Sequence, residues 1–543
     1  MADATYDAVI IGGGNKGLVL AMYLAKYGGM SVGVFEKRHE AGGGWSTEEG
    51  AVPGFLADYH AHGTGSVYTV VIERDFPEWN DTGVKYIECP VGGAAIFKDD
   101  GSCIVTYNRL ADPTHEKTVK SIALHSKRDA ETWLGRVRKL RRAFMPNLME
   151  WVHTPAKLPG EPDALERLFM DPDSGFDPSW TTKTLVEVLR DIYESDAMIS
   201  MLIRDAQSWG FLPDVIGWGW FPAVWAQLAM TGRTIGTVGG THNLAHAAVK
   251  VFLMNGGKIF TQQEVDRIII ENGKARGIVL TDGSQIEARR LVVSTLDPYN
   301  LCFRLIGKEY LSWQILRRVE NLESRYTCIT WYYWALHEHP KFTAASINPD
   351  INEATNIVIV NKDPEAQLRQ QHMRRMGIMP HELQLQYSNH SLADPTRAPE
   401  GKSIIMTEQF VLPANMMSEA EWLEYKKVHA EEVMALLQAH TTNMSWDNVV
   451  GYIPLTPYDH CRLANMAPTG NWGVIDNIPS QIGRLRPIPE LAQHRTPVEN
   501  LYATGTAWHP WGCGACWQGY NCYKIITEDF GLRKPWEESG SPW

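Results

Sequence analysis

The chain has 543 residues, of which 44% are hydrophobic and 21% charged, a balance typical of a soluble globular protein with a large core. This length exceeds one ordinary compact domain and predicts two domains. The net charge of −12 and the lack of a long run of Lys and Arg argue against a nucleic-acid-binding surface.

The first predicted elements are a strand, a helix and a second strand. Residues 7–11 are a short apolar run of the kind found in buried parallel strands. Residues 18–27 contain good helix formers and no proline, and residues 31–35 form a short strand that ends at Glu36. This order predicts a βαβ unit and therefore a parallel sheet.

The remaining elements alternate along the chain. Helices are predicted at residues 131–151, 183–208, 241–255 and 519–530. Short strands are predicted within residues 258–289, with hairpin turns at Asn272-Gly273 and Asp282-Gly283. Further strands are predicted at residues 291–294, 327–336, 382–387, 403–411 and 501–504, and the middle three of these five belong to a second sheet.

A glycine motif joins the first strand to the first helix. Gly12 permits a tight turn, Gly14 allows a phosphate to approach the backbone, and Gly17 lets the helix pack closely on the strand. The phosphates would lie at the helix N-terminus, where free N–H groups favour negative charge. Glu36 follows about 20 residues after the last glycine, as a ribose-binding acid does. The alternative is a surface acid after a glycine turn.

Two more glycine clusters fit a long, planar cofactor. Gly42, Gly43 and Gly44 precede Trp45, and a loop there suits a ligand longer than a nicotinamide dinucleotide, although a flexible loop explains it too. Near the end, Gly505 precedes the segment 508–521, whose glycines lead into the last helix. The N–H groups at the start of that helix could stabilise negative charge on a reduced flavin.

Together these features resemble the phytoene desaturase-like, or carotenoid oxidoreductase, family of FAD-dependent oxidoreductases in the flavin amine-oxidase superfamily. The matching segments cover about a third of the chain. They are residues 9–49, 53–55 with Asp58 and His62, 238–241, 277–298 and 496–521.

The resemblance implies FAD as cofactor. Gly12, Gly14 and Gly17 would hold the pyrophosphate and Glu36 the adenosine ribose. The backbone of Val265 would contact the adenine. Gly505 and the segment 512–521 would lie along the ribityl chain and the ring. The predicted cofactor-binding residues are Gly12, Gly14, Gly17, Glu36, Lys37, Gly43, Gly44, Trp45, Val265, Gly505, Gly512, Gly519, Tyr520 and Asn521.

The predicted fold class is α/β, in which a Rossmann-like FAD-binding domain with a parallel sheet is interleaved with an α+β substrate domain on an antiparallel sheet. The cofactor features occur at the start, in the middle and at the end of the chain, so the FAD-binding domain is discontinuous. We place it at residues 1–120, 225–300 and 455–543, and the substrate domain at residues 121–224 and 301–454.

The sequence departs from the family near its end. Trp511, Cys513, Cys516 and Trp517 follow His509-Pro510, where the family has an open, glycine-rich stretch, so we expect a smaller substrate than a long polyene. The C-x-x-C spacing of the two cysteines permits a redox pair, but small packing residues are favoured. Lys16, inside the glycine motif, could lie near the phosphates, but a solvated lysine is the favoured interpretation.

The catalytic residues are not identified by the sequence. His62, His509 and Asp58 are the candidates for an acid or base, although a single histidine is more often a hydrogen-bonded structural residue. His60 and His62 are close in sequence but lack a third ligand, so no metal site is predicted. The tryptophan clusters could pack in the core or line a pocket.

We therefore predict an FAD-dependent oxidoreductase that transfers a hydride from an apolar, isoprenoid-like or alicyclic substrate to flavin N5, by desaturation, dehydrogenation or water-derived hydroxylation. Alternatives are a flavin amine oxidase, a flavin-dependent isomerase and a non-catalytic FAD-binding subunit of a complex. The expected ligand is a small apolar substrate, without nucleic acid. The electron acceptor is unknown, and homo- or hetero-oligomers stay open.

The predicted location is cytoplasmic. The first residues carry no basic stretch typical of a signal peptide. No apolar run reaches the roughly 20 residues that a membrane-spanning helix needs. Peripheral membrane contact stays open.

Overall fold

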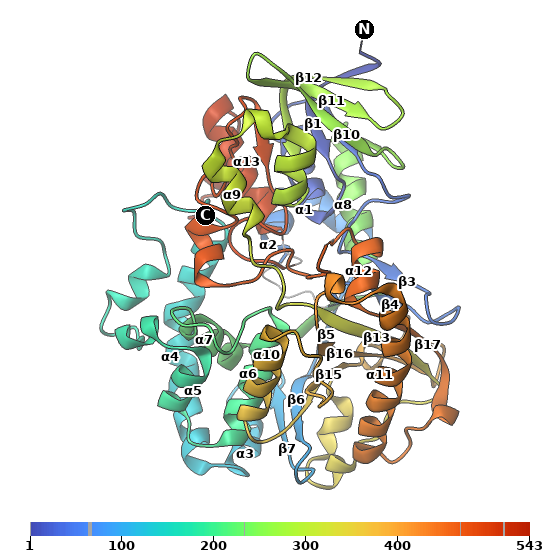
Figure 1. Cartoon of the computed structure of the whole chain (residues 1–543). Helices are drawn as coiled ribbons and strands as arrows, with labels where there is room; N and C mark the ends of the chain where they lie inside the picture. Colours follow the sequence, from blue (N-terminus) through green and yellow to red (C-terminus); the bar gives the residue numbers. More distant parts are fainter. Residues whose placement is uncertain (1, 63–67, 233, 467, 514–515) are drawn as a thin grey trace.

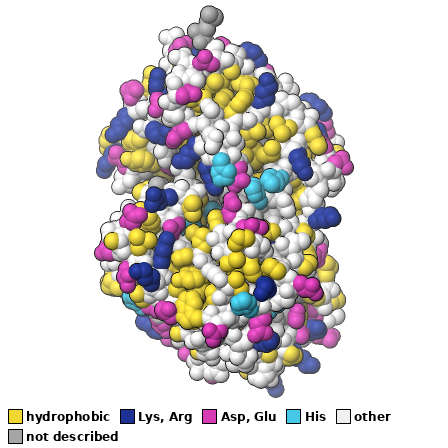
Figure 2. Space-filling view, turned by 90° about the vertical axis from the view of Figure 1, so that its right-hand side faces the viewer, with side chains coloured by type: hydrophobic (Ala, Val, Ile, Leu, Met, Phe, Trp, Pro, Cys, Tyr) yellow, Lys and Arg dark blue, Asp and Glu magenta, His cyan; other side chains and the backbone are white. Residues whose placement is uncertain are grey.

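The computed structural model describes residues 2–62, 68–232, 234–466, 468–513 and 516–543. Two seven-stranded sheets organise these residues, and Figure 1 shows one sheet in the upper half of the molecule and the other in the lower half. On the face shown in Figure 2, histidine side chains gather near the level where the two halves meet. The chain passes between the halves several times, so segments distant in sequence build each half.

The first sheet has a parallel centre. Its strands follow the order β10-β11-β12-β1-β2-β9, and β18 pairs with the C-terminal half of β12. β10 and β11 form an antiparallel hairpin, whereas β12, β1, β2, β9 and β18 are parallel. The strands are β1 (Ala4–Ile11), β2 (Val32–Phe35), β9 (Lys258–Phe260), β10 (Val265–Glu271), β11 (Lys274–Leu280), β12 (Gln285–Ser294) and β18 (Leu501–Ala503).

Helices cover both faces of this sheet, which explains why β1 and β2 are almost continuously apolar. One face packs against α1 (Asn15–Lys26), α8 (His242–Met254) and α13 (Trp517–Phe530), with α2 (Val70–Asp75) and α14 (Pro535–Glu538) beside them. The other face packs against residues 300–306 and α9 (Trp313–Glu320). The C-terminal ends of the parallel strands stay available for a ligand.

The second sheet is mainly antiparallel, in the order β17-β13-β16-β15-β14-β6-β7. β14 and β6 run parallel, and the other neighbouring pairs are antiparallel. The strands are β6 (Val91–Phe97), β7 (Cys103–Tyr107), β13 (Ile329–Leu336), β14 (Asn356–Val360), β15 (Leu385–Ser388), β16 (Ser403–Phe410) and β17 (Val449–Leu455). Two small sheets pair β3 (Thr47–Glu48) with β4 (Ala57–Asp58) and β5 (Tyr86–Cys89) with β8 (Thr234–Thr237).

Helices also lie on both sides of the second sheet (Figure 1). One side carries α3 (Glu116–Ala123), α4 (Lys127–Val152), α5 (Leu185–Ile192), α6 (Asp196–Ser208), α7 (Trp220–Ala229) and α10 (Glu365–Arg375). α11 (Glu419–His440) covers the other side, and α12 (Pro457–Leu463) follows β17. Over the described ranges, none of the helices combines the length and the apolar character needed to cross a membrane.

The predicted α/β fold class is confirmed, with two local differences. The helix predicted over residues 183–208 is two helices, α5 and α6. The helix is interrupted at residues 193–195. There the carboxylate of Asp129 accepts hydrogen bonds from the backbone N–H groups of Glu194 (3.0 Å) and Ser195 (2.8 Å). The strand predicted at residues 291–294 is the end of the longer strand β12.

The predicted domain limits remain a proposal. Two strands, β6 and β7, belong to the second sheet although the predicted limits, with a boundary at residue 120, assign them to the FAD-binding domain. β6 pairs with β7 on one edge and with β14 over residues 94–97 on the other, so this hairpin joins the second sheet through β14. The long sequence separation of these partners hides the pairing from local sequence patterns.

Candidate functional site

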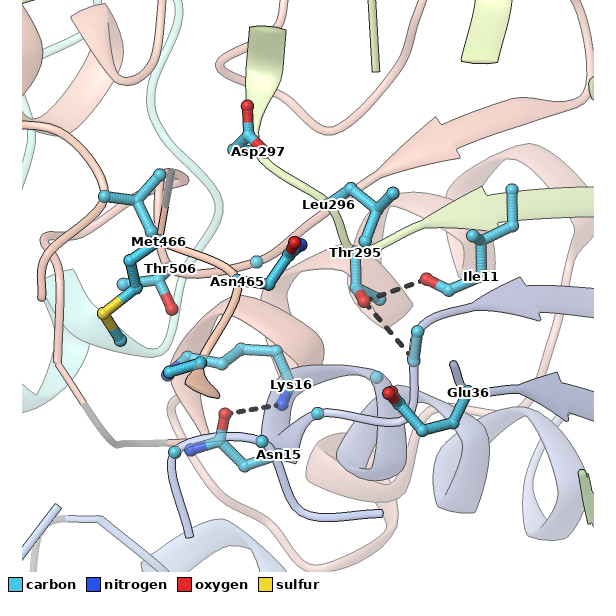
Figure 3. Close-up of a pocket in the computed structure, with 18 of the residues that line it drawn as sticks. Ile11, Asn15, Lys16, Glu36, Thr295, Leu296, Asp297, Asn465, Met466 and Thr506 are labelled. Carbon is cyan, nitrogen blue, oxygen red and sulfur yellow. Dashed lines mark hydrogen bonds between the residues drawn. The ribbon is translucent and has the colours of Figure 1, made fainter. Parts of the chain in front are cut away.

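The glycine turn after β1 is closed by close backbone contacts. Gly12 has a φ of +93°, and a Cβ there would collide with the hydroxyl of Thr295. That hydroxyl donates hydrogen bonds to the carbonyl oxygens of Ile11 (2.9 Å) and Gly12 (3.3 Å), as Figure 3 shows. A Cβ on Gly17 would lie 2.5 Å from the carbonyl oxygen of Gly12. Glycine is therefore required at both positions.

The N-terminus of α1 opens into a cavity. Gly14 is the N-cap residue with extended backbone and has no side chain to cap the helix, while the Lys16 N–H donates to Asn15 Oδ1 (3.0 Å). The second glycine cluster packs on this turn, because Gly42 forms a bridge to Gly14 and a Cβ on Gly43 would lie 2.9 Å from the Gly14 Cα. The exposed N–H groups and the helix dipole favour a negatively charged group at this point.

Glu36 closes the end of β2 beside the turn. Its Oε2 accepts a hydrogen bond from the backbone N–H of Gly13 (2.7 Å), and its Oε1 accepts one from that of Arg38 (2.8 Å). Each carboxylate oxygen keeps further lone pairs for a ligand hydroxyl. Lys37 follows and donates to the side-chain oxygen of Asn465 (3.0 Å).

A cavity of about 200 Å³ lies along these elements. It brings together segments from the start, the middle and the end of the chain, as predicted for a discontinuous site. The backbone carbonyl of Val265 lies at its edge and accepts a hydrogen bond from Arg304 (2.8 Å). The predicted residues that line this first cavity are Gly12, Gly14, Gly17, Glu36, Lys37, Gly43, Gly44, Val265 and Gly505.

Five other predicted residues do not line the first cavity. Trp45 is buried in the core with α1 and α8. Gly512 packs on Gly473, and Gly519 lets α13 approach α1, since a Cβ there would collide with the Lys16 carbonyl. The hydroxyl of Tyr520 accepts from Arg74 (2.9 Å), and Asn521 donates to the Val152 carbonyl (3.0 Å). Contact of these residues with a cofactor stays a prediction, and Gly514 and Ala515 lie outside the described residues.

The position of Lys16 differs from the favoured interpretation as a solvated lysine. Its side chain is buried because the segment before α13 covers the first turn of α1, and its ammonium group donates to the backbone carbonyl of Cys513. Burial lowers the pKa of Lys16 to about 8. Figure 3 shows the side chain inside the cavity, across from Asn465 and Met466. At pH 7 the ammonium form predominates and adds a positive charge to the wall of the first cavity.

A second, larger cavity of about 480 Å³ adjoins the first. Among the described residues, four line both cavities: His60, Ala61, Trp472 and Cys513. The second cavity lies between the second sheet and the helices α4, α6 and α7. Apolar side chains such as Met145, Met201 and Leu228 supply much of its wall, as expected for a small-molecule site.

The tryptophans divide between the cavity and the core. Trp209, Trp225, Trp331 and Trp472 line the second cavity. Trp218, Trp220, Trp511 and Trp517 instead pack in or against the core cluster built by α4 to α7. A ring contact joins the two groups, since the Trp225 ring lies edge-on to Trp511, with centroids 6.4 Å apart. Both alternatives left open by the sequence therefore occur in one continuous aromatic cluster.

Three histidines in the second cavity are held neutral by burial. Burial lowers the pKa of His60 to about 3 and that of His390 to about 3, and it lowers the pKa of His62 as well. His62 stacks on His390, with ring centroids 5.3 Å apart, and lies edge-on to Trp331. These rings therefore add polar surface without adding charge at neutral pH.

Of the predicted catalytic candidates, His62 lines a cavity whereas Asp58 and His509 line neither. Asp58 is buried and accepts hydrogen bonds from Thr47, Thr241 and Arg397, the last at 2.9 Å. His509 shares a hydrogen bond with the Trp151 carbonyl (2.9 Å), and burial lowers its pKa to about 4. Both residues hold segments together.

The sequence missed the carboxyl groups of the second cavity. Glu408 forms an ion pair with Arg204 (2.8 Å), and Asp394 forms one with Arg397 (3.1 Å). Asp205 also lines this cavity, and burial raises its pKa to about 7. A signal for Asp205 existed in the sequence, because it interrupts an otherwise apolar face of a predicted helix.

The eight cysteines all lie within the described residues, and none of them forms a disulfide. Cys513 lines both cavities, whereas Cys516 is buried at the start of α13, where burial raises its pKa. Among the residues that the structure describes, no group of three or more His, Cys, Asp or Glu side chains could hold a metal ion.

Comparison with known proteins finds similarity to flavin-containing oxidoreductases. Residues 93–328 match the family described as flavin containing amine oxidoreductase, and residues 10–72 match the NAD(P)-binding Rossmann-like domain. A limonene dehydrogenase subunit from Castellaniella defragrans is 26% identical over 98% of this chain and 96% of its own length. A neurosporene-forming phytoene desaturase of Rhodobacter capsulatus is 23% identical over 50% of this chain and 49% of its own. A solved oxidoreductase from Methanosarcina mazei shares the fold, with a TM-score of 0.60 and 18% identity over 96% of this chain and 99% of that chain.

Proposed function

This chain is an FAD-dependent oxidoreductase similar to the flavin-containing amine oxidoreductases and the phytoene desaturases, and we propose that it removes a hydride from a small, isoprenoid-like or alicyclic substrate. The observation that carries the proposal is the junction of the two cavities, where an aromatic, largely apolar chamber meets the glycine-turn site at four residues. The family match and the relatives confirm the resemblance and the cofactor that the sequence predicts.

The first cavity fits FAD on its own geometry. Gly12 and Gly17 permit the tight turn, and Gly14 at the α1 N-terminus has no side chain to obstruct a pyrophosphate. Glu36 would bind the adenosine ribose, Lys16 would add a positive charge, and Val265 and Gly505 would border the cofactor. When bound, FAD supplies the acceptor for the hydride. The residues at the cavity junction would contact its ring.

The second cavity would bind and orient the substrate. Burial of apolar surface contributes roughly 25 cal/mol per Å², so tryptophan and methionine side chains would supply most of the affinity. The same side chains exclude water from the reacting carbon. The neutral histidines favour an uncharged substrate. The cavity volume of about 480 Å³ suits a small ring compound. The relative named as a limonene dehydrogenase component supports a cyclic terpene and a partner chain for this protein too.

Anaerobic bleaching of the bound flavin tests this proposal. Purified protein should be yellow, and a cyclic or acyclic terpenoid from a panel should bleach it, while amines should not. Product mass then separates the reactions: a change of about −2 mass units means desaturation, about +16 means hydroxylation, and an unchanged mass with a changed product spectrum means isomerisation. Bleaching by amines alone would contradict the proposal, as would a bound flavin that no compound of the panel reduces.

A further inference from the structure

The side chain of Asp205 belongs to the wall of the second cavity. Asp205 lies in α6, where Met201, Asp205, Ser208 and Trp209 line the same cavity. Their spacing of three or four residues places them on one face of the helix. A carboxyl group therefore interrupts an apolar and aromatic face that borders the substrate chamber.

This carboxyl group lacks the partners that buried acids normally have. Its Oδ2 is buried, and no described residue donates a hydrogen bond to it. A buried polar atom left without a partner costs about 1–3 kcal/mol, so such atoms are rare unless a ligand uses them. Burial raises the pKa of Asp205 to about 7, and the neighbouring Arg204 opposes this shift.

The other carboxyl and imidazole groups of the cavity are poor proton acceptors. Glu408 is bound by Arg204 at 2.8 Å, and Asp394 is bound by Arg397 at 3.1 Å. The three histidines have lowered pKa values, so they take up protons only in acid. The remaining charged side chains of the cavity are arginines, which cannot accept a proton and favour ionised carboxylates. They are Arg109, Arg141 and Arg397. General bases work best with a pKa near the working pH.

A continuous wall joins Asp205 to the junction of the cavities. Trp209 lies one helical turn after Asp205, and its ring contacts that of Tyr68, with centroids 6.5 Å apart. The Tyr68 carbonyl in turn accepts the backbone N–H of Cys516 (3.3 Å), three residues after Cys513. Cys513 lines both cavities. A substrate in contact with this wall can therefore meet Asp205 and the cofactor site together.

We propose that Asp205 is a catalytic residue that accepts the proton released when the substrate is oxidised. The inference rests on the proposed function. In a desaturation, one substrate C–H bond breaks and its electron pair leaves as hydride to the flavin. A C–H bond on the adjacent carbon breaks and gives its proton to the Asp205 carboxylate. The electron pair of that second bond becomes the new π bond, and Asp205 ends as a neutral carboxylic acid.

The test compares Asp205→Asn with wild type, both full-length and loaded with FAD. The amide keeps the shape of the side chain but cannot accept the proton. With a compound that bleaches wild type, we expect the rate of anaerobic flavin reduction to fall by roughly 10²–10⁴-fold, the usual contribution of a general base. FAD content and reduction by dithionite should not change.

The matched control is Asp214→Asn, which removes a partly exposed carboxylate paired with Arg375 at 2.6 Å outside both cavities. It should reduce its flavin at the wild-type rate. Reduction of Asp205→Asn at that same rate would overturn the proposal for Asp205 and leave the proposed function standing. A wild-type flavin that no terpenoid reduces would refute the proposed function and this inference together.

An infrared titration gives a readout independent of turnover. In wild type without substrate, a carboxylic-acid C=O band should appear as the pH falls through about 7. The band should be missing in Asp205→Asn and present in Asp214→Asn. A wild type without such a band, or an Asp205→Asn protein that keeps it, would overturn the assignment of Asp205 as the proton acceptor.

Discussion

The two adjoining cavities are built in different ways. The first is organised by backbone features, namely a glycine turn, a helix N-terminus and strand ends, and Glu36 and Lys16 lie beside the turn. The walls of the second are side chains from the second sheet and from α4, α6 and α7. A backbone site depends on residue spacing and serves one fixed ligand, whereas a side-chain site can change with the substrate.

The largest expected effect comes from adding a side chain to the backbone-built cavity. Gly17→Val would place a Cβ 2.5 Å from the Gly12 carbonyl and push the α1 N-terminus out of place. We expect less than about a tenth of the wild-type flavin content, measured by absorbance after purification; overpacking of this kind costs about 1–3 kcal/mol or more. Gly135→Ala is the control, because its Cβ would enter open space in α4. Equal flavin content in the two variants would contradict the glycine-turn site.

The next effect concerns the free energy of unfolding, which depends on pH through Asp205 in the side-chain-built cavity. The folded-state pKa of Asp205, about 7, is above its ordinary value of 3.8, so the folded protein binds a proton that the unfolded chain releases between these values. Wild type therefore loses stability as the pH rises from about 4 to 7, and Asp205→Asn does not. The variant should gain up to about 4 kcal/mol over wild type across this range, measured by urea unfolding. An unchanged difference between the two proteins would exclude a buried, unpaired carboxyl group.

A third prediction separates substrate binding from cofactor binding. Trp209→Leu removes aromatic surface from the second cavity only, so flavin content should stay at the wild-type level. The dissociation constant of a terpenoid that bleaches the flavin should rise by about 10–100-fold, because large aromatic side chains dominate apolar binding. Trp313→Leu, on a side chain 71% exposed in α9, is the control and should change neither property. A loss of flavin in Trp209→Leu would show that the two cavities are not separate in function.

The smallest expected effect concerns Lys16. Its pKa of about 8 means that the ammonium group loses its proton as the pH rises above that value. Because a protonated lysine attracts the FAD phosphates, FAD affinity in wild type should fall above pH 8, by at most about tenfold per pH unit. Lys16→Met should bind FAD more weakly below pH 8 and lose this pH dependence, as followed by flavin fluorescence. A parallel pH dependence in both proteins would remove Lys16 from the cofactor site.

The sequence predicted the backbone-built cavity well because its chemistry is local. The glycine spacing and the acid at Glu36 lie within one βαβ unit, where the turn leaves few alternatives. The family resemblance added Val265 and Gly505, which lie far apart in sequence and line the same cavity. The glycine-rich segment near the end was harder, because Gly519 serves the packing of α13 on α1, and a glycine pattern does not distinguish packing from ligand contact.

The side-chain-built cavity could not be predicted in the same way. Asp205 lies in α6 and Glu408 in β16, and only the packing of that helix on the second sheet brings them to one chamber. The burial of Lys16 also depends on a segment about 500 residues away in the chain. Such long-range contacts leave no periodic pattern in the sequence.

An experimental structure of the FAD-loaded protein with a saturated terpene analogue tests the central claim most directly. We predict the adenine dinucleotide along the glycine turn in the first cavity and the flavin ring beside His60, Ala61, Trp472 and Cys513. The analogue should occupy the second cavity, in contact with Trp209 and Asp205. A flavin ring away from the junction, or an analogue bound outside the second cavity, would contradict this account.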